Sequence, residues 1–144
     1  MKKIILILIS ICVLTGCNHV YDNNEFNFGP DEMLSLDRTS ADSPFKVLYE
    51  LNDGRKIITN FDSIDYRYYQ DDQKDTIEVS LGEALDNNIL TTNDFIDKLS
   101  LLETDNSDLY CNEAKTQCLY ICENDNIVLG TDTNIDDIIS ECSR

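Results

Sequence analysis

The sequence predicts an α+β fold, a small antiparallel sheet of hairpins with a short helical hairpin packed on it. Three observations support this class. Apolar residues alternate along residues 45–81 on both sides of short polar turns, which is the pattern of half-buried strands. Two helix-start signals follow between residues 80 and 102, and short apolar runs return in residues 108–130. Strands therefore flank the helical pair along the chain, so we expect the helices to form a layer on the sheet.

Two hairpins are predicted in residues 45–81. In FKVLYELNDGRKIITNF, residues 45–61, the apolar alternation breaks at Asp53-Gly54 and then resumes. Both positions of an Asp-Gly turn tolerate positive φ, which makes this pair a strong hairpin signal. The second hairpin joins SIDYRYY to TIEVSL across the charged turn QDDQKD.

The helical pair is predicted from two capping boxes. Ser80 with Glu83, and Thr91 with Asp94, place a hydroxyl and a carboxylate three residues apart. Each side chain can then satisfy a free backbone N–H at the start of a helix. The Asn-Asn pair at residues 87–88 can end the first helix in a left-handed conformation,.

The last third of the chain predicts three short strands, DLYC, QCLYIC and NIVLG, and a brief closing helix that begins at residue 133 or 134. The same segment opens like a calcium-binding loop, because Asp132, Asn134 and Asp136 alternate as EF-hand ligands do,. The pattern then fails, since Asp137 stands where the turn glycine belongs and Ser143 where the bidentate glutamate belongs,. Helix capping by the first polar residues is the better interpretation.

The N-terminus has the order of a secretory signal. Lys2 and Lys3 precede a nearly unbroken apolar run over residues 4–14, and small residues follow,. A helix that crosses a bilayer needs about 20 apolar residues, so this run is too short for a permanent span. An N-terminal core helix is also disfavoured, because no polar residue marks a solvent face in the run,.

Leu14, Thr15, Gly16 and Cys17 resemble the lipobox of bacterial lipoproteins. The resemblance implies that residues 1–16 are a signal peptide, that the chain is cut before Cys17, and that a diacylglycerol is linked to the Cys17 sulfur. Two acyl chains hold a protein on a membrane where one chain binds only reversibly. The expected location is therefore the cell membrane, lipid-anchored on its extracytoplasmic face.

Three regions are predicted: the signal peptide at residues 1–16, the lipidated cysteine and a flexible tether at residues 17–44, and one α+β domain at residues 45–144. Residues 18–44 are polar, contain both prolines and show no useful periodicity,. A few apolar residues within this tether could dock on the domain as a short helix or strand. They are Phe26, Phe28, Met33, Leu34 and Leu36.

The charge of the chain limits its partners. Without residues 1–16, nine basic residues stand against 28 acidic ones, a formal charge of −19. This charge repels phosphate backbones and anionic lipid headgroups, so no nucleic-acid partner is expected, whereas basic partners stay open. The alternative is that acidity merely keeps an exported protein soluble.

Four cysteines, Cys111, Cys118, Cys122 and Cys142, form an even set in an exported chain, which predicts two disulfides with three possible connectivities,. Zinc binding and free thiols are the alternatives, and the spacings lack the paired knuckles of a zinc ribbon. If DLYC and QCLYIC form a hairpin, Cys111 lies opposite Cys118 within disulfide range. Cys122 is then left for Cys142 on the closing helix.

The sequence favours no enzyme. The single histidine, His19, lies two residues after Cys17 in the tether, so nucleophilic triads lack a positioned base,. The five glycines form neither a phosphate loop nor a dinucleotide fingerprint,. A carboxylate pair cannot be singled out among 28 acids,. No catalytic residue, metal ligand or cofactor is therefore predicted.

These observations predict a surface-exposed, membrane-anchored lipoprotein with a non-enzymatic interaction role, in contact with a protein or envelope component. The alternative is a divalent-cation-binding or purely structural envelope lipoprotein. The order of helical pair, strands, IVLG and a terminal cysteine also resembles small uncharacterised lipoproteins of low-GC bacteria. That resemblance implies no activity.

Overall fold

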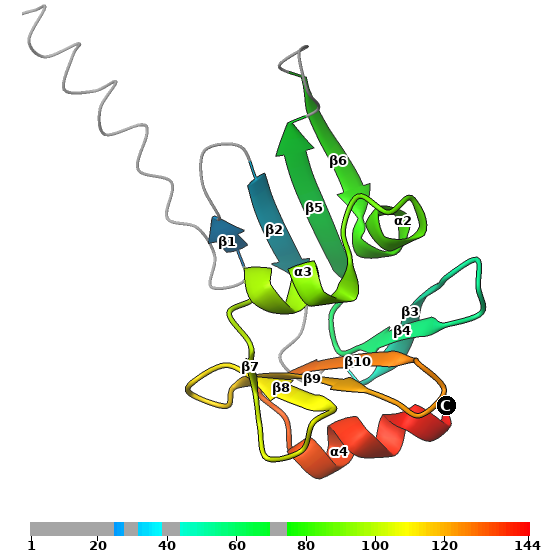
Figure 1. Cartoon of the computed structure of the whole chain (residues 1–144), viewed down its shortest axis with the longest axis vertical. Coiled ribbons are helices and arrows are strands. Elements are labelled where there is room, and N and C mark those ends of the chain that lie inside the picture. The colour runs from blue at the N-terminus through cyan, green and yellow to red at the C-terminus, as the bar shows by residue number, and fades with distance from the viewer. Residues whose placement is uncertain (1–24, 28–31, 39–43, 70–74) are drawn as a thin grey trace, which may run out of the picture.

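The protein is a mixed α+β structure with two sheets and short helices. A computed structural model describes residues 25–27, 32–38, 44–69 and 75–144. The four-stranded sheet has the order β1-β2-β5-β6, and the six-stranded sheet has the order β3-β4-β10-β9-β8-β7. Figure 1 shows α2 and α3 on one side of the six-stranded sheet, toward the other sheet, and α4 on its opposite side. The predicted class is confirmed, but the predicted single sheet of hairpins is wrong.

The four-stranded sheet is antiparallel throughout. β5 and β6, at one end of this sheet, form the predicted second hairpin, in which Tyr66 lies opposite Val79. Leu34, Leu36, Ile64 and Tyr66 alternate along the central strands and are buried on one face. The strands are β1 (Glu25–Asn27), β2 (Glu32–Asp37), β5 (Ser63–Tyr69) and β6 (Thr76–Ser80).

The strand docking that the sequence left open for the apolar residues of the tether, residues 17–44, is observed in β1 and β2. β2 pairs with β5 along six residues, and its Leu34 and Leu36 are buried in the main core. Two leucines spaced by one residue bury the same face of a strand, and this burial outweighs the polar composition around them. The folded part therefore begins before residue 45. Residues 1–16 and Cys17 lie outside the described residues.

The six-stranded sheet contains the predicted first hairpin. β3 and β4 are antiparallel around Asp53-Gly54, where Gly54 has a φ of 91°. A register shift between Val47 and Tyr49 breaks the simple alternation expected for β3,. β7 was not predicted. The strands are β3 (Lys46–Glu50), β4 (Lys56–Thr59), β7 (Leu102–Glu103), β8 (Leu109–Cys111), β9 (Gln117–Ile121) and β10 (Ile127–Thr131).

β4 and β10 form a parallel pair, which the sequence did not predict. Two buried asparagines close its ends. At one end the Asn126 Oδ1 accepts the backbone N–H of Lys56 at 2.8 Å. At the other end Asn60 donates to the Thr131 carbonyl at 2.8 Å and accepts the Thr131 N–H at 3.2 Å. The Asn60 amide thus extends the strand ladder with side-chain atoms.

Both predicted capping boxes start helices. Ser80 caps α2 (Leu81–Asp86) with Glu83, and Thr91 caps α3 (Thr92–Lys98) with Asp94. Asn88 has a φ of 55°, which confirms the left-handed residue expected after α2. Ser100 also has a φ of 55°, and α3 therefore ends before Leu102.

The six-stranded sheet separates the buried apolar residues into two cores, one on each of its faces. The main core lies between the two sheets and contains Phe95 and Leu99 from the α3 region together with Leu119 and Leu129 from the six-stranded sheet. The second core lies on the other face of that sheet, under Ile138 of α4 (Ile135–Ser140). A 3-10 turn, η1 (Glu141–Ser143), follows α4.

Replacing Asn60 by alanine should weaken the junction between β4 and β10. The Asn60 side chain is 4% exposed, so its loss leaves the Thr131 N–H without this partner in a buried setting. We expect the free energy of unfolding to fall by about 1–3 kcal/mol. Urea unfolding monitored by circular dichroism measures it.

Asn134→Ala is the matched control, because Asn134 is exposed and makes no side-chain capping bond in the structure. It should change the free energy of unfolding by less than about 0.5 kcal/mol. Equal losses in Asn60→Ala and Asn134→Ala would contradict the structural role of the Asn60 amide.

Candidate functional site

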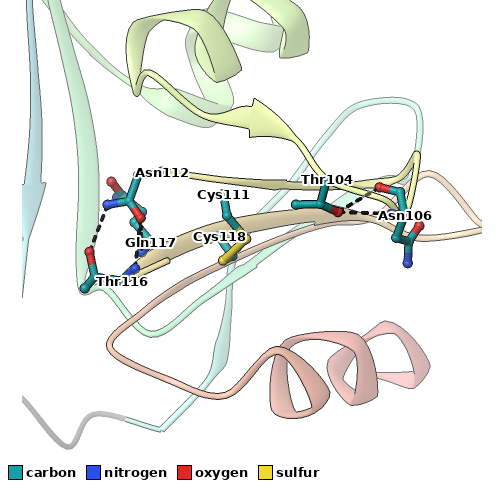
Figure 2. The surroundings of a disulfide bond; sticks show 7 residues. All are labelled: Thr104, Asn106, Cys111, Asn112, Thr116, Gln117 and Cys118. Carbon is teal, nitrogen blue, oxygen red and sulfur yellow. Dashed lines mark hydrogen bonds between the residues drawn. A yellow bond between two sulfur atoms is a disulfide. The ribbon is translucent and has the colours of Figure 1, made fainter. Parts of the chain in front are cut away.

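The four cysteines lie in the two pairs that the sequence favoured. Cys111 of β8 is directly opposite Cys118 of β9, with a Cα separation of 4.1 Å (Figure 2). This is the close spacing of an antiparallel pair without ladder hydrogen bonds between its members. Cys122, just after β9, is bonded to Cys142 in η1 at a Cα separation of 5.6 Å. The first disulfide staples a hairpin and the second fastens the C-terminus to the sheet.

The turn between β8 and β9 is held by Asn112. Its Oδ1 accepts the backbone N–H groups of Thr116 and Gln117 at 2.9 and 3.1 Å. Its Nδ2 donates to the Thr116 hydroxyl at 2.8 Å (Figure 2). Lys115 takes a φ of 54° within the turn. The adjoining residues Glu113 and Ala114 are therefore held in place by side-chain contacts next to the disulfide.

The two disulfides can be mapped by peptide analysis without reduction. Trypsin cuts after Lys115, chymotrypsin after Tyr120 and a glutamate-specific protease after Glu123, so the three enzymes together separate all four cysteines. We expect linked peptides that join Cys111 to Cys118 and Cys122 to Cys142. Prior reduction should release every linked peptide and lower the thermal midpoint, because each closure restricts the unfolded chain.

A hollow of about 630 Å³ lies beside β7. We call it the β7 groove. It lies at the end of α3, where the chain passes into β7, and the turn between β8 and β9 closes its other side. Its lining residues are Asp97, Ser100, Leu101, Leu102, Asn112, Glu113 and Ala114.

Leu102 is the exposed apolar residue of the β7 groove. It is 63% exposed, the highest value among the large hydrophobic residues that are exposed in the described part of the chain. It lies opposite Cys111 in the β7–β8 pair, and therefore belongs to the face of the sheet that carries α4. Its neighbour Leu101 is buried in the main core. Adjacent leucines thus point to opposite faces, as strand geometry requires.

The exposure of Leu102 follows from the position of α4. α4 packs mainly on β9 and β10 in the middle of the six-stranded sheet. A helix with its side chains is about 10–12 Å wide, whereas six strands spaced at about 4.8 Å span about 24 Å. α4 covers the middle of the face and leaves both edges open. Val47 on the opposite edge strand β3 is 41% exposed for the same reason.

Carboxylates surround the apolar part of the β7 groove. Asp97 and Glu113 line it, and the exposed Glu103 follows Leu102 in β7. Lys98 lies over the Tyr66 ring, 5.4 Å from its centroid, on the core side of α3. The groove therefore combines an exposed leucine with two lining carboxylates and no basic lining residue.

Two further hollows are mainly polar. One, of about 620 Å³, is lined by Asp53 and Arg55, which pair with each other at 2.8 Å. The other, of about 420 Å³, is lined by Asp132, Asn134 and other polar residues of the segment that begins like a calcium loop. Among the described residues, no group of three or more His, Cys, Asp or Glu side chains is placed to hold a metal ion.

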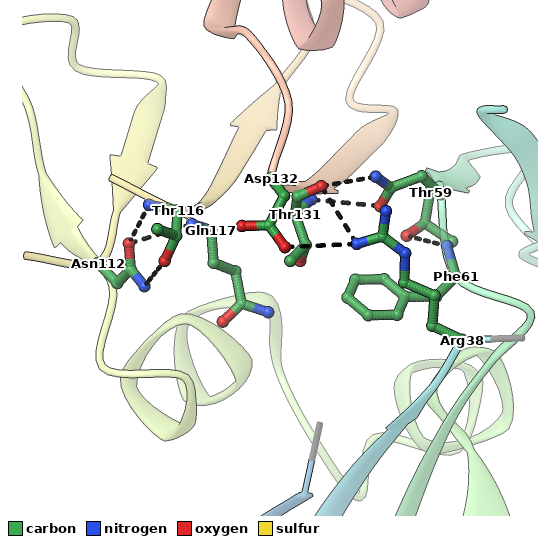
Figure 3. A network of polar contacts seen from close by, with 9 residues as sticks. Arg38, Thr59, Phe61, Asn112, Thr116, Gln117, Thr131 and Asp132 are labelled. Atoms are coloured by element: carbon green, nitrogen blue, oxygen red, sulfur yellow. Dashed lines mark hydrogen bonds and ion pairs between the residues drawn. The ribbon is translucent and has the colours of Figure 1, made fainter. Parts of the chain in front are cut away.

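Asp132 instead belongs to a polar junction between the sheets. The Arg38 guanidinium, just after β2, lies 3.6 Å from the Asp132 carboxylate and 3.5 Å from the Thr131 carbonyl (Figure 3). Asp132 has a φ of 52°, and its N–H donates to the Thr116 carbonyl. These contacts give Asp132 a structural role at the end of β10.

The shifted pKa values have local structural causes. Backbone and side-chain hydrogen bonds from Ser80 lower the pKa of Glu83, and those from Thr91 lower the pKa of Asp94. Hydrogen bonding to the Asp86 carboxylate raises the pKa of the Tyr49 hydroxyl, which donates to it at 3.0 Å. Helix caps and tertiary contacts account for these shifts.

The Glu83 capping box should add to the pH dependence of stability. The folded pKa of Glu83 lies below its ordinary value of 4.5. The carboxylate therefore stabilises the fold above the unfolded pKa, and this contribution is lost as pH falls through the folded pKa. Glu83→Gln keeps a capping side chain without the charge. We expect the stability difference between the native chain and Glu83→Gln to shrink between pH 7 and about pH 3.

Urea unfolding at several pH values measures this difference. Glu123→Gln is the control, since Glu123 is an exposed glutamate that starts no helix. Its stability difference from the native chain should stay nearly constant over the same range. A pH-independent difference for Glu83→Gln would contradict the capping role of its charge.

The comparisons with known proteins add no relative. Searches against protein-family models, curated proteins and solved structures give no match. In the part of the chain that the structure describes, no helix is long and apolar enough to cross a membrane. Cys17 and His19 lie outside that part. The predicted lipid site therefore stays a prediction, and the β7 groove is a feature that the sequence analysis missed.

The double leucine at residues 101–102 was the available signal for the β7 groove. The spacing of Leu99 and Leu102 by one helical turn instead indicates the apolar end of a helix,. The left-handed Ser100 ends that helix and turns Leu102 into an edge strand. A serine carries no strong stop signal, in contrast to glycine or proline, so no residue pattern predicts the end of the helix at Ser100.

Proposed function

We propose that the protein is a bacterial lipoprotein that is anchored to the extracytoplasmic face of the cell membrane through Cys17 and presents its domain for a non-enzymatic interaction. One observation carries the anchoring. Basic residues, a short apolar run and the residues Leu14-Thr15-Gly16-Cys17 occur together at the N-terminus,. This combination resembles the lipobox signal, in which the cysteine becomes the lipidated first residue.

Two features of the domain support this proposal. Both cysteine pairs are within disulfide geometry, and structural disulfides persist mainly outside the cytoplasm,. The exposed leucine in the β7 groove favours contact with another molecule,.

The anchor can be tested with Cys17→Ser. The serine hydroxyl cannot form the thioether to diacylglycerol, so we expect no incorporation of labelled fatty acid and no cleavage before residue 17. Metabolic labelling and the mass of the purified protein measure the two effects. Asn18→Ser is the control beside the cleavage site, and it should be labelled and cut like the native chain.

The anchoring proposal fails if Cys17→Ser is still labelled and cut after Gly16. The interaction role is tested separately by crosslinking in intact cells, which is combined with the groove variants in the following subsection.

A further inference from the structure

The β7 groove is a surface whose shape and charge together specify a partner. It holds the most exposed of the large apolar side chains that are exposed among the described residues, Leu102. Single exposed leucines are common on protein surfaces, but this one lines a hollow of about 630 Å³ together with Leu101 and Ala114,. An apolar side chain of a partner could therefore be enclosed there.

The carboxylates beside the hollow specify the charge of the partner. Asp97 and Glu113 line the groove, and Glu103 is exposed next to Leu102. The chain as a whole carries a formal charge of −17. Such a surface attracts cationic segments and accelerates their association, whereas it repels anionic ones.

The same charge disfavours the other occupants. A second copy of the chain would bring two strongly negative molecules together, with the lining carboxylates Asp97 and Glu113 of each copy at the contact,. Anionic lipid headgroups meet the same repulsion. Pairing of a partner strand with β7 is limited as well, because β7 has two residues and offers few backbone groups,. Recognition must therefore come from side chains.

We propose that the β7 groove binds a cationic segment of a partner protein, with an apolar side chain against Leu102 and lysine or arginine side chains against Asp97 and Glu113. This inference rests on the proposed interaction role and names the kind of partner. The turn that carries Glu113 is held by Asn112 and the adjacent disulfide, so one wall of the groove is formed before binding,.

Binding is measured on the full chain in detergent by fluorescence anisotropy. The probe is a labelled peptide of lysine, glycine and leucine. One control peptide has glutamate in place of lysine, and a second has serine in place of leucine. We expect the native chain to bind the lysine–leucine probe, with weaker binding at higher salt, and to bind the glutamate peptide far less.

Three variants separate the contributions. Leu102→Gln should weaken binding of the lysine–leucine probe by about fivefold or more, through lost apolar contact. Glu113→Gln should weaken binding and reduce its salt dependence. Val47→Gln is the matched control, because Val47 is an exposed apolar residue on the opposite edge strand. It should bind like the native chain, and thermal unfolding checks that all three variants fold.

The serine-containing peptide tests the apolar contact itself. It should bind the native chain and Leu102→Gln equally, since it has no leucine to place against residue 102. Equal binding of the lysine–leucine probe to Leu102→Gln and Val47→Gln would overturn the proposal. So would dimerisation of the native chain that Leu102→Gln abolishes in sedimentation, because the groove would then belong to a second copy.

Crosslinking in intact cells separates this inference from the proposed function. A photo-crosslinking side chain is placed at position 102, at position 47 or at exposed positions elsewhere. Capture of a basic protein from position 102 alone supports the groove. Capture only from other positions overturns the groove and leaves the interaction role standing. Absence of capture from every position overturns both.

Discussion

The parallel pairing of β4 with β10 is the constraint on which the rest of the structure depends. It joins a hairpin near the start of the domain to strands near its end, with a register that aligns Ile57 with Ile127. Parallel pairs are slightly less stable per residue than antiparallel ones and need a long crossover. The side chains of Asn60 and Asn126 add hydrogen bonds at the two ends of this short pair. All elements from β5 to β9 lie within the crossover.

The position of the crossover explains the unequal covering of the six-stranded sheet. β5, β6, α2 and α3 belong to the crossover. Together with β1 and β2 they pack against one face of the six-stranded sheet, where the main core lies. In the described part of the chain, the segment after β10 covers the middle of the other face with α4 and η1, which the disulfide between Cys122 and Cys142 fastens to the sheet. Because α4 packs mainly on β9 and β10, the edges of the face stay open at Val47 and Leu102.

Local features of this fold could be predicted from the sequence, and non-local ones could not. The Asp53-Gly54 turn and the caps at Ser80 and Thr91 depend on side chains within a few residues, so their patterns are direct signals,. The β4–β10 pair depends on Asn60 and Thr131, which are far apart in sequence. An isolated asparagine has no pattern that marks it as a strand extension.

Burial explains both the predicted start of the domain at residue 45, which lies after β2, and the β7 groove, which was not predicted. β2 carries only two buried leucines among polar residues, and its ladder with β5 makes it a strand. Leu101 and Leu102 are identical in sequence character, yet Leu101 is buried in the main core and Leu102 is 63% exposed. Their difference arises at Ser100, whose left-handed backbone ends α3. The site therefore depends on a backbone change that composition does not encode.

The β7 groove also depends on contacts that are remote from any partner. The disulfide between Cys111 and Cys118 fixes the hairpin on which β7 is paired, and Asn112 fixes the turn that carries Glu113. A strongly acidic chain repels itself, which loosens segments that have few apolar contacts,. The disulfide beside β7 opposes this repulsion at the site where carboxylates lie near the exposed Leu102. The carboxylates of the β7 groove can therefore stay in place despite their mutual repulsion. The disulfide restrains the hairpin beside them, as a larger apolar core would otherwise do.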